Sequence, residues 1–542
     1  MKFPKIFLTC VVIVVSACQH ASQKPEPAVQ ASSLAVISIN DVYRTAGIDA
    51  GKTGGLARVR ALRKKLQSEY EHVLLLHAGD FLHPSFASKQ DNGASMIQIM
   101  NHLDGAFDEF DQDMVVTFGN HEFDKSKAKY TPLMEGLLNK SEFTWLDSNI
   151  NWQTGFNKND HVINSIIKTY GDLNVGIFSF TTDMQHPDFI ESFDGFAATA
   201  EKYVPALREQ GADVVIALTH QWLQDDVAMM QLPLSYRPDV IFGGHEHFAQ
   251  LEAVNDRWII KADADAASAA VVEISQSNGG VSIEQPIIVP LDHNIQEDPK
   301  TARWVAALNQ SIDHAYCRKI EHESEQCLAT ELGKTQVKLI AEETEIRRFE
   351  TNLGSLLADL ALAPFKSCGA DIALLNSGSI RLNQNIPAGD SITQKHLEEM
   401  FPYPSDLRLI EINGKTLQAI LNHSVSGWTA NGHWLQIAGL AYTHDSDLQT
   451  ATHIHVNSSN ETIQDDQIFR AVVPHYLISP VTNHDGYHMI DESMEVSCEK
   501  TTNNPTLRET KHLFKQYLMQ SPEGISPETK GRICHVQTQQ CN

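Results

Sequence analysis

Residues 114–122 read Met-Val-Val-Thr-Phe-Gly-Asn-His-Glu, and this stretch decides the fold. Five apolar or β-branched residues in a row are typical of a buried strand, so the polar residues that follow lie in a loop at its carboxyl end. Loops of this kind are where layered α/β folds gather the side chains that bind ligands. The stretch therefore predicts a layered α/β domain with a site at the ends of its strands.

The same change from apolar to polar residues recurs between Leu34 and Pro290. The other runs that read as buried strands are 35–39, 73–77, 175–179, 214–218 and 240–242. The polar groups that follow four of them are Asn40-Asp41, Gly79-Asp80, Thr219-His220 and Gly243-Gly244-His245-Glu246-His247. One histidine after a strand is usually a packing residue, but five such groups in chain order predict a common site.

The residue types at these strand ends are those that a two-metal hydrolytic site needs. Carboxylates supply charge and can bridge two cations, and neutral imidazoles bind borderline metals such as Zn, Mn or Fe. Two ions about 3.5–4 Å apart can polarise a phosphoryl group and generate hydroxide at neutral pH.

In order and spacing, Gly119-Asn-His-Glu122 and Gly244-His-Glu-His247 resemble the motifs of the calcineurin-like metallophosphoesterases, and within them the 5′-nucleotidase family. The resemblance covers nearly everything after residue 33. It implies a four-layer β-sandwich flanked by helices, followed by a second α/β domain that binds the substrate. It also implies two divalent metal ions, drawn from Mn, Zn, Co or Fe.

The resemblance further assigns metal ligands and two catalytic residues, His121 and Asn120. The implied ligands are Asp41, Asp80, Asn120, His220, His245 and His247. Asp80 is expected to bridge both ions, and Asp41 and His247 to complete the first position. Asn120 and the other two histidines are expected to hold the second ion. His121 is implied to contact the scissile phosphate, where it stabilises charge or donates a proton.

One position departs from the family pattern, which has Asp-x-His where this chain has Asp41-Val42-Tyr43. Three alternatives stay open. In the first, Tyr43 binds as a phenolate, which would favour a hard ion such as Fe(III). In the second, Tyr43 only packs and leaves the first position open or weaker. In the third, His83 reaches the site, from a position at which the related purple acid phosphatases carry a ligating tyrosine.

Residues 350–354 (Glu-Thr-Asn-Leu-Gly) and 376–381 (Asn-Ser-Gly-Ser-Ile-Arg) resemble two ligand-binding segments of the family's second domain. Two arginines there would supply positive charge for phosphate or ribose, and two tyrosines would stack on a nucleobase. The implied substrate-binding residues are Arg347, Asn376, Arg381, Tyr403, Tyr476 and Asp485. Substitutions within these motifs leave the exact ligand open.

The length of 542 residues and the net charge of −26 set further limits. A chain of this length forms more than one core, and we expect a metallophosphoesterase domain at 34–295, a helical linker at 296–330 and the substrate-binding domain at 331–542. The acidic surface repels nucleic acid, so DNA or RNA is not an expected partner. The partner that the resemblance implies is a small nucleotide. The sequence does not indicate an oligomeric state.

The N-terminus has the pattern of an export signal. Lys2 and Lys5 precede an apolar run at 6–17, which is too short to span about 30 Å of hydrocarbon as a helix. Val15-Ser-Ala-Cys18 resembles the lipobox of bacterial lipoproteins, which predicts a signal at 1–18, a lipid on Cys18 and a tether at 19–33. An ordinary cleaved signal with a chance cysteine is the alternative. Gln19 after the cysteine favours anchoring in the outer membrane, facing the periplasm or the cell surface.

The remaining cysteines of the exported chain lie in its second half. They are Cys317, Cys327, Cys368, Cys498, Cys534 and Cys541. An even number in an exported chain indicates disulfides, and six cysteines allow fifteen connectivities. Short separations make Cys317–Cys327 and Cys534–Cys541 the expected pairs.

The function predicted from these features is metal-dependent hydrolysis of nucleoside 5′-monophosphates or related phosphoesters to nucleoside and phosphate. Serines within the second-domain motif keep open a hydrolase of the same fold for a UDP-sugar, a cyclic nucleotide or a sulfur ester. A nucleotide-binding lipoprotein whose metal site has decayed is the alternative outside catalysis, and Tyr43 is its only support.

Overall fold

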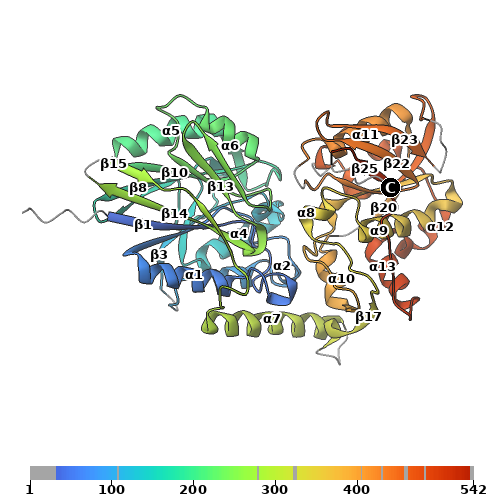
Figure 1. The fold of residues 1–542 in the computed structure, drawn as a ribbon, viewed down its shortest axis with the longest axis horizontal. Helices are drawn as coiled ribbons and strands as arrows, with labels where there is room; N and C mark the ends of the chain where they lie inside the picture. The colour runs from blue at the N-terminus through green and yellow to red at the C-terminus, as the bar shows by residue number, and fades with distance from the viewer. Residues whose placement is uncertain are drawn as a thin grey trace, which may run out of the picture.

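The computed structural model describes residues 32–106, 109–277, 280–320, 326–403, 406–428, 431–456, 462–480 and 484–537. Over these residues the chain forms two α/β domains that lie side by side (Figure 1). The predicted signal, Cys18 and all but the last two residues of the predicted tether lie outside the described residues. Within the described residues no helix combines the length and the apolar character that crossing a membrane requires.

Two β-sheets form the centre of the first domain. The first sheet has eight strands in the order β15-β14-β1-β2-β3-β4-β6, with β16 also paired to β14. Their bounds are β1 (Ser32–Ile39), β2 (His72–His77), β3 (Asp111–Thr117), β4 (Phe143–Leu146), β6 (Val162–Ile163), β14 (Ser268–Ser277), β15 (Gly280–Ile283) and β16 (Ile287–Pro290).

The second sheet has six strands in the order β12-β13-β11-β10-β8-β7. Their bounds are β7 (Ser165–Tyr170), β8 (Leu173–Thr181), β10 (Val214–His220), β11 (Val240–Gly243), β12 (Gln250–Val254) and β13 (Arg257–Lys261). A separate pair joins β5 (Ile150–Trp152) to β9 (Ile190–Phe193). Each apolar run that the sequence marked as a strand in this domain lies in a strand of one of the two large sheets.

Helices cover the outer faces of both sheets. Alternate residues of β1 show the layering, since Leu34 and Val36 pack between the sheets while Ala35 and Ile37 pack toward the helices. The helices on the first sheet's side are α1 (Leu56–Glu69), α2 (Phe86–Asp91), α3 (Ala94–Met100) and α4 (Thr131–Lys140), and those on the second sheet are α5 (Phe196–Glu209) and α6 (Leu223–Met230). This confirms the predicted four-layer sandwich flanked by helices.

A long helix, α7 (Pro299–Ile320), runs along the first domain and leads to the second (Figure 1). Val305 of α7 packs in the same core as α1, and Ile312 packs with Phe86 of α2. A disulfide between Cys317 and Cys327 joins the end of the helix to the segment that leads into the second domain. The predicted Cys317–Cys327 pair is therefore confirmed.

The second domain is also α/β. Its sheets have the orders β20-β24-β18-β21, β23-β22-β25 and β17-β19. The strands are β17 (Glu331–Lys334), β18 (Ile372–Asn376), β19 (Ser391–Thr393), β20 (Leu407–Asn413), β21 (Leu435–Ala438), β22 (Leu440–Asp445), β23 (Thr450–Val456), β24 (Ile468–Pro474) and β25 (Ile533–His535). The helices are α8 (Glu343–Ile346), α9 (Asn352–Leu362), α10 (Gln394–Met400), α11 (Gly414–Val425), α12 (Glu499–Asn503) and α13 (Thr510–Met519).

A second disulfide joins Cys368 to Cys498 across 130 residues of this domain. The sequence did not single out this pair, because nothing in a separation of that length indicates proximity. The predicted Cys534–Cys541 pair stays a prediction, since Cys541 lies outside the described residues.

Candidate metal centre

The carboxyl ends of β1, β2, β3, β10 and β11 meet at one edge of the sandwich. Parallel pairing of β1 with β2 and of β2 with β3 aligns three of these ends in the first sheet, and β10 with β11 aligns two in the second. The Nδ1 atom of His220, at the end of β10, lies 2.7 Å from the carbonyl oxygen of Ala78 after β2, which ties the two sheets together. The six predicted ligands that this edge brings together are Asp41, Asp80, Asn120, His220, His245 and His247.

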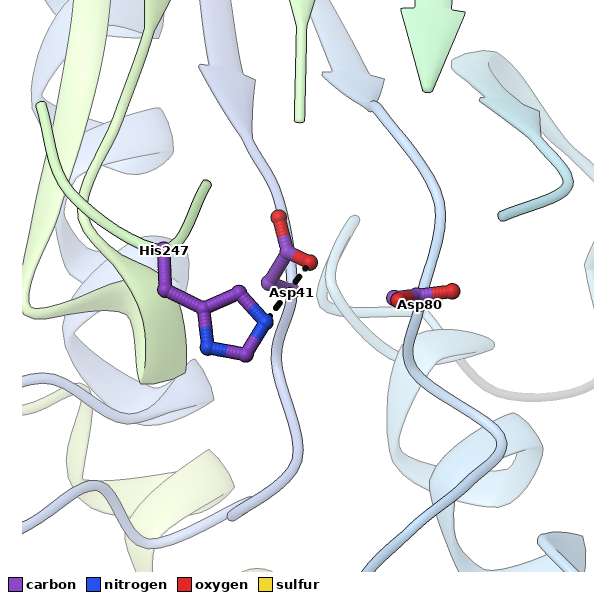
Figure 2. Close-up of side chains that lie close together, drawn as sticks. All are labelled: Asp41, Asp80 and His247. Carbon is purple, nitrogen blue, oxygen red and sulfur yellow. Dashed lines mark ion pairs between the residues drawn. The ribbon is translucent and has the colours of Figure 1, made fainter. Parts of the chain in front are cut away.

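Three of these residues form a compact donor group, which we call the triad: Asp41, Asp80 and His247. Each can offer one donor atom, and the three atoms lie within 4.8 Å of one another. Figure 2 shows the three side chains, with Asp41 and His247 joined as an ion pair whose Oδ1 to Nε2 distance is 3.3 Å. Two carboxylates and an imidazole suit Zn, Mn or Fe, so the triad is a possible metal-binding site.

A second row of donor atoms starts at the same Asp80. The Nε2 of His220 lies 3.1 Å from its Oδ2. The Nδ1 of His245 lies 3.3 Å from that Nε2 and 3.1 Å from the Oδ1 of Asn120. The row offers an oxygen from each of Asp80 and Asn120 and an imidazole nitrogen from each of His220 and His245. Oxygen and imidazole donors of this kind suit a second cation.

Neighbouring acceptors determine which nitrogen of two histidines faces the donors. A carbonyl oxygen accepts and cannot donate, so His220 carries a hydrogen on Nδ1, which faces Ala78, and turns Nε2 toward Asp80. His247 is oriented in the same way, because its Nδ1 lies 2.5 Å from the Oε2 of Glu343. Such outer partners hold a ligating imidazole in place and raise its basicity.

The glycines of the two sequence motifs are required by close approaches of the chain. A Cβ atom at Gly119 would lie 2.1 Å from the Oδ1 of Asp80. One at Gly244 would lie 2.5 Å from the carbonyl oxygen of Ala78. Any larger residue would therefore displace a metal donor or separate the two sheets.

The backbone is strained at four of the six predicted ligands. The φ angles of Asp41, Asp80, His245 and His247 are 51°, 60°, 92° and 66°. Left-handed conformations are uncommon for residues with a side chain, and strained ones cost of order 1–3 kcal/mol each and gather at functional sites. The strained backbone conformations direct these four side chains toward the candidate metal centre.

Charges at the site are balanced within the protein. Burial opposes ionisation of both aspartates, yet His247 and His220 hold the pKa of Asp41 below its usual range, and His220 lowers the pKa of Asp80 to about 2. The carboxylates overcome the effect of burial on the imidazoles, so the pKa of His220 rises to about 10 and that of His247, beside Glu343, to about 9. The ionised carboxylates require buried positive charge, and a divalent ion can supply it in place of protons. The residues present fit a metal.

Tyr43 points into the triad. Its hydroxyl lies 3.1 Å from the Oδ2 of Asp80, 3.1 Å from the Nε2 of His247 and 3.4 Å from the Oδ1 of Asp41. Burial and the two carboxylates raise the pKa of Tyr43 well above its usual value. His83, the other candidate, is buried with its pKa lowered to about 4, and the structure does not bring it into the triad.

His121 contacts the metal centre through its backbone, whereas its side chain is bonded to Asp124. Its backbone N–H donates to the Oδ1 of Asp80 at 2.7 Å, and its Nδ1 lies 2.8 Å from the Oδ1 of Asp124. The other oxygen of Asp124 accepts a hydrogen bond of 3.2 Å from the hydroxyl of Tyr403 in the second domain. The sequence analysis missed Asp124, although a carboxylate three residues after His121 was a usable signal.

Glu122, the last residue of the Gly119-Asn-His-Glu122 motif, binds backbone N–H groups of two loops, which indicates a structural role and not that of a metal ligand. It is buried, and its Oε1 accepts hydrogen bonds from the N–H groups of Phe81 and Leu82 at 2.8 and 3.0 Å. Its Oε2 accepts from the N–H groups of Asp80 and Gly119 at 2.8 and 2.5 Å. One carboxylate thereby holds together the loops after β2 and β3.

Three of the six predicted substrate residues are bonded to one another. The hydroxyl of Tyr476 donates to the Oδ1 of Asp485 at 2.9 Å, and the Nδ2 of Asn376 donates to its Oδ2 at 2.8 Å. The guanidinium of Arg381 lies 5.9 Å from the ring of Tyr403, and its buried Nη1 has no hydrogen-bond partner among the described residues. That unpaired N–H is a ready donor for an anionic ligand.

Arg347 is committed to a different partner. Its Nη2 donates to the Oε1 of Glu343 at 3.0 Å, and that carboxylate in turn meets His247. The sequence analysis missed Glu343, because no motif marks it and its role depends on how the two domains are placed.

A cavity of about 710 Å³ lies beside the triad, between both domains and α7. Its walls include Tyr43, Glu343, Phe86 and Ile312. Arg381 is the one predicted substrate residue that lines it. Tyr403 and Tyr476 do not line it.

Two known families match this chain. Residues 34–249 match the calcineurin-like phosphoesterase family, and residues 331–492 match the 5′-nucleotidase C-terminal domain. The first match contains all six predicted metal ligands, and the second contains the predicted substrate residues. The fold, the donors and both matches define a phosphoesterase, a hydrolase of phosphoric esters. Within that class the chain belongs to the 5′-nucleotidase family.

Individual relatives agree with this assignment. The chain is 24% identical to the trifunctional nucleotide phosphoesterase protein YfkN of Bacillus subtilis over 87% of its own length, but spans only 33% of that longer protein. It is 24% identical to the 5′-nucleotidase of Bos taurus, covering 86% of each chain. The crystal structure of a 5′-nucleotidase precursor from Thermus thermophilus superposes with a TM-score of 0.74 at 21% identity, over 93% of this chain and 99% of that one.

Proposed function

We propose that the chain hydrolyses nucleoside 5′-monophosphates, or closely related phosphoesters, to nucleoside and phosphate with the help of two divalent ions. The observation that carries the proposal is that the triad and the second donor row share Asp80 and lie next to His121. When bound, two ions at such positions polarise the phosphoryl group and lower the pKa of a water molecule.

The protein's own groups supply binding and proton transfer in this proposal. With Nδ1 of His121 held by Asp124, Nε2 is the nitrogen that can give a proton to the leaving oxygen or stabilise its charge. The unpaired Nη1 of Arg381 binds the phosphate. Tyr403 and Tyr476 stack on the base.

The remaining substrate contacts follow from the bonds that those groups now make. Asp485 accepts hydrogen bonds from Tyr476 and Asn376, so it can accept them equally from the hydroxyls of a ribose. Arg347, paired with Glu343, adds positive charge behind the phosphate. We propose that residues 34–295 form the catalytic domain, 296–330 the linker and 331–542 the domain that selects the substrate.

The test is phosphate release by the purified protein after a chelator has stripped it of metal. Mn, Zn, Co, Mg or Fe would be added separately, with AMP, UMP, UDP-glucose and cyclic AMP as substrates and His121→Ala as the control variant. Release that needs a transition metal and falls in the variant supports the proposal, and the best substrate defines the specificity. Tight nucleotide binding with no turnover under any metal would instead favour a binding protein.

We also propose that residues 1–18 are an export signal, that Cys18 carries a lipid and that residues 19–33 tether the enzyme to a bacterial outer membrane. The support is the sequence pattern alone. Cys18→Ser should release the protein from the membrane fraction without changing its activity. Retention of the variant in that fraction would contradict lipid anchoring.

A further inference from the structure

One hydrogen bond at the metal centre crosses from the second domain to the first. The Oε2 of Glu343 lies 2.5 Å from the Nδ1 of His247, a member of the triad. Glu343 begins α8, which lies on the side of the second domain that faces the first (Figure 1). Both side chains are almost fully buried, with exposed fractions of 5% and 7%.

Both oxygens of this carboxylate are already engaged. The Oε1 of Glu343 accepts from Arg347 at 3.0 Å, while Oε2 meets His247. Its backbone N–H donates to the Oδ1 of Asn383 at 3.2 Å, and the Nδ2 of Asn383 donates to Asp265 of the first domain at 3.1 Å. Glu343 is therefore held firmly in place as a partner of a metal ligand and not as a ligand itself.

The two donor sets differ in which domain supplies the group that accepts from the Nδ1 of the ligating histidine. His220, in the second row, is oriented by the carbonyl oxygen of Ala78 within its own domain. His247, in the triad, is oriented by a carboxylate that only the second domain supplies. A carboxylate on Nδ1 fixes the ring and strengthens Nε2 as a ligand, and losing such a partner typically costs 10–100-fold in metal affinity.

We propose that Glu343 is a positioning residue for His247, and that the first metal position is complete only when the second domain is docked against the first. This inference rests on the proposed metal-dependent function. By thermodynamic linkage, metal at the first position and docking of the domains stabilise each other to the same extent. The second metal position is independent of docking.

Other interdomain contacts gather around the same point. Arg44, next to Tyr43, pairs with Asp265 at 2.7 Å and also donates to the carbonyl oxygen of Arg381 in the second domain. The Tyr403–Asp124 bond is a further contact between the two domains, beside His121. The first metal position thus lies within the interface between the two domains. Metal occupancy at that position and the stability of the interface should therefore affect each other.

The test begins with metal titration of the metal-free full-length chain, using Mn and separately Zn in competition with a chromophoric chelator. Glu343→Gln keeps the shape of the side chain but removes its negative charge. Glu345→Gln, on the exposed face of the same helix, is the matched control. We expect two binding steps in the wild type, one of them weakened about 10–100-fold in Glu343→Gln and neither changed in Glu345→Gln.

Hydrogen exchange of the interface gives a readout that does not depend on catalysis. In the wild type, metal should slow exchange in α8 and in the loop after β11. In Glu343→Gln, the slowing of hydrogen exchange by metal should decrease by the same factor as the affinity of the weakened metal-binding step. Should Glu343→Gln fail to fold, Glu343→Asp keeps the pairing charge for Arg347 but is too short to reach His247, and the same loss is expected.

The outcomes separate this inference from the proposed function. Two unchanged binding steps in a folded Glu343→Gln would overturn the inference and leave the function standing. Unchanged metal affinity with a lowered KM would also overturn it, since Glu343 would then compete with phosphate for Arg347. A wild type that binds no metal would reject both.

Discussion

The two halves of the site are built in different ways. In the first domain, donors project from strand ends, are buried and are fixed by strained backbone and by clamps such as Glu122. In the second domain, the candidate substrate groups are held mainly by side chains bonded to one another, as in the Tyr476–Asp485 pair. The difference indicates that the metal donors are fixed by rigid backbone, while the candidate substrate-binding side chains can exchange their hydrogen bonds to one another for hydrogen bonds to a ligand.

This exchange is energetically easy. A hydrogen bond between two protein side chains contributes only about 0.5–1.5 kcal/mol net, because water or a ligand can replace either partner. Tyr476 is 36% exposed, whereas Asp41 is fully buried. A nucleotide can therefore displace the Tyr476–Asp485 bond at little cost, but no ligand can rearrange the triad without disturbing the sheets.

The largest effect should come from the donor that both halves of the metal centre share. Asp80→Asn keeps the size of the side chain but removes its charge, so we expect both ions to bind poorly and kcat to fall by more than about 10³-fold, beyond the 10–100-fold typical of an outer partner. Phosphate release and metal content would be measured together. Glu209→Gln, an exposed carboxylate on α5, should change neither. A variant with normal metal content and activity would contradict the assignment of Asp80.

The next largest effect should come from His121, which lies between the metal donors and, through Asp124, Tyr403 of the second domain. His121→Ala should lower kcat by about 10²–10⁴-fold, as expected for loss of a proton donor, with metal content preserved. Asp124→Asn should have a smaller effect, because it weakens the orientation of His121 and the contact with Tyr403 but leaves the imidazole in place. Steady-state kinetics with AMP would measure both. Equal losses in metal affinity and kcat would show that His121 is a ligand.

A third effect should appear in KM and not in kcat. Tyr476→Ala removes an exposed ring that we propose stacks on the base, which is worth about 1–3 kcal/mol, or roughly fivefold to 150-fold in KM. Tyr476→Phe keeps the ring and loses the hydroxyl that donates to Asp485, so its KM should stay close to that of the wild type. If the two variants behave alike, the hydroxyl matters and stacking does not.

The contrast between the two halves also explains what the sequence could predict. The six donors were predictable because each follows an apolar run, and the carboxyl ends of parallel strands meet at one edge. Gly119 and Gly244 belong to the same local signal, because their roles depend on neighbours close in the sheet. The same runs predicted a layered α/β fold, and the family resemblance implied its four layers.

Glu343 could not be predicted in this way. Its partner His247 lies 96 residues away and in another domain, so their contact depends on a docking arrangement that no local pattern encodes. The same holds for the Cys368–Cys498 disulfide, with its separation of 130 residues. The pairing of Arg347 with a carboxylate was missed for a related reason, since a motif identifies an arginine but not its partner.

The smallest effect on catalysis, though not on stability, should come from the disulfides, both of which lie in or beyond α7 among the described residues. In the chain-entropy account, removing the Cys368–Cys498 link should cost about 5 kcal/mol of unfolding free energy, against about 3 kcal/mol for the ten-residue Cys317–Cys327 link. Double alanine variants of each pair would be compared by calorimetry, with the metal affinity and kcat measured below the transition. Those two quantities should not change, because the sheets of the first domain hold the donors and Glu343 stays bonded to His247 as long as the second domain remains folded and docked. A loss of metal affinity on removal of Cys368–Cys498 would instead show that the fold of the second domain supports the metal centre more broadly than through Glu343.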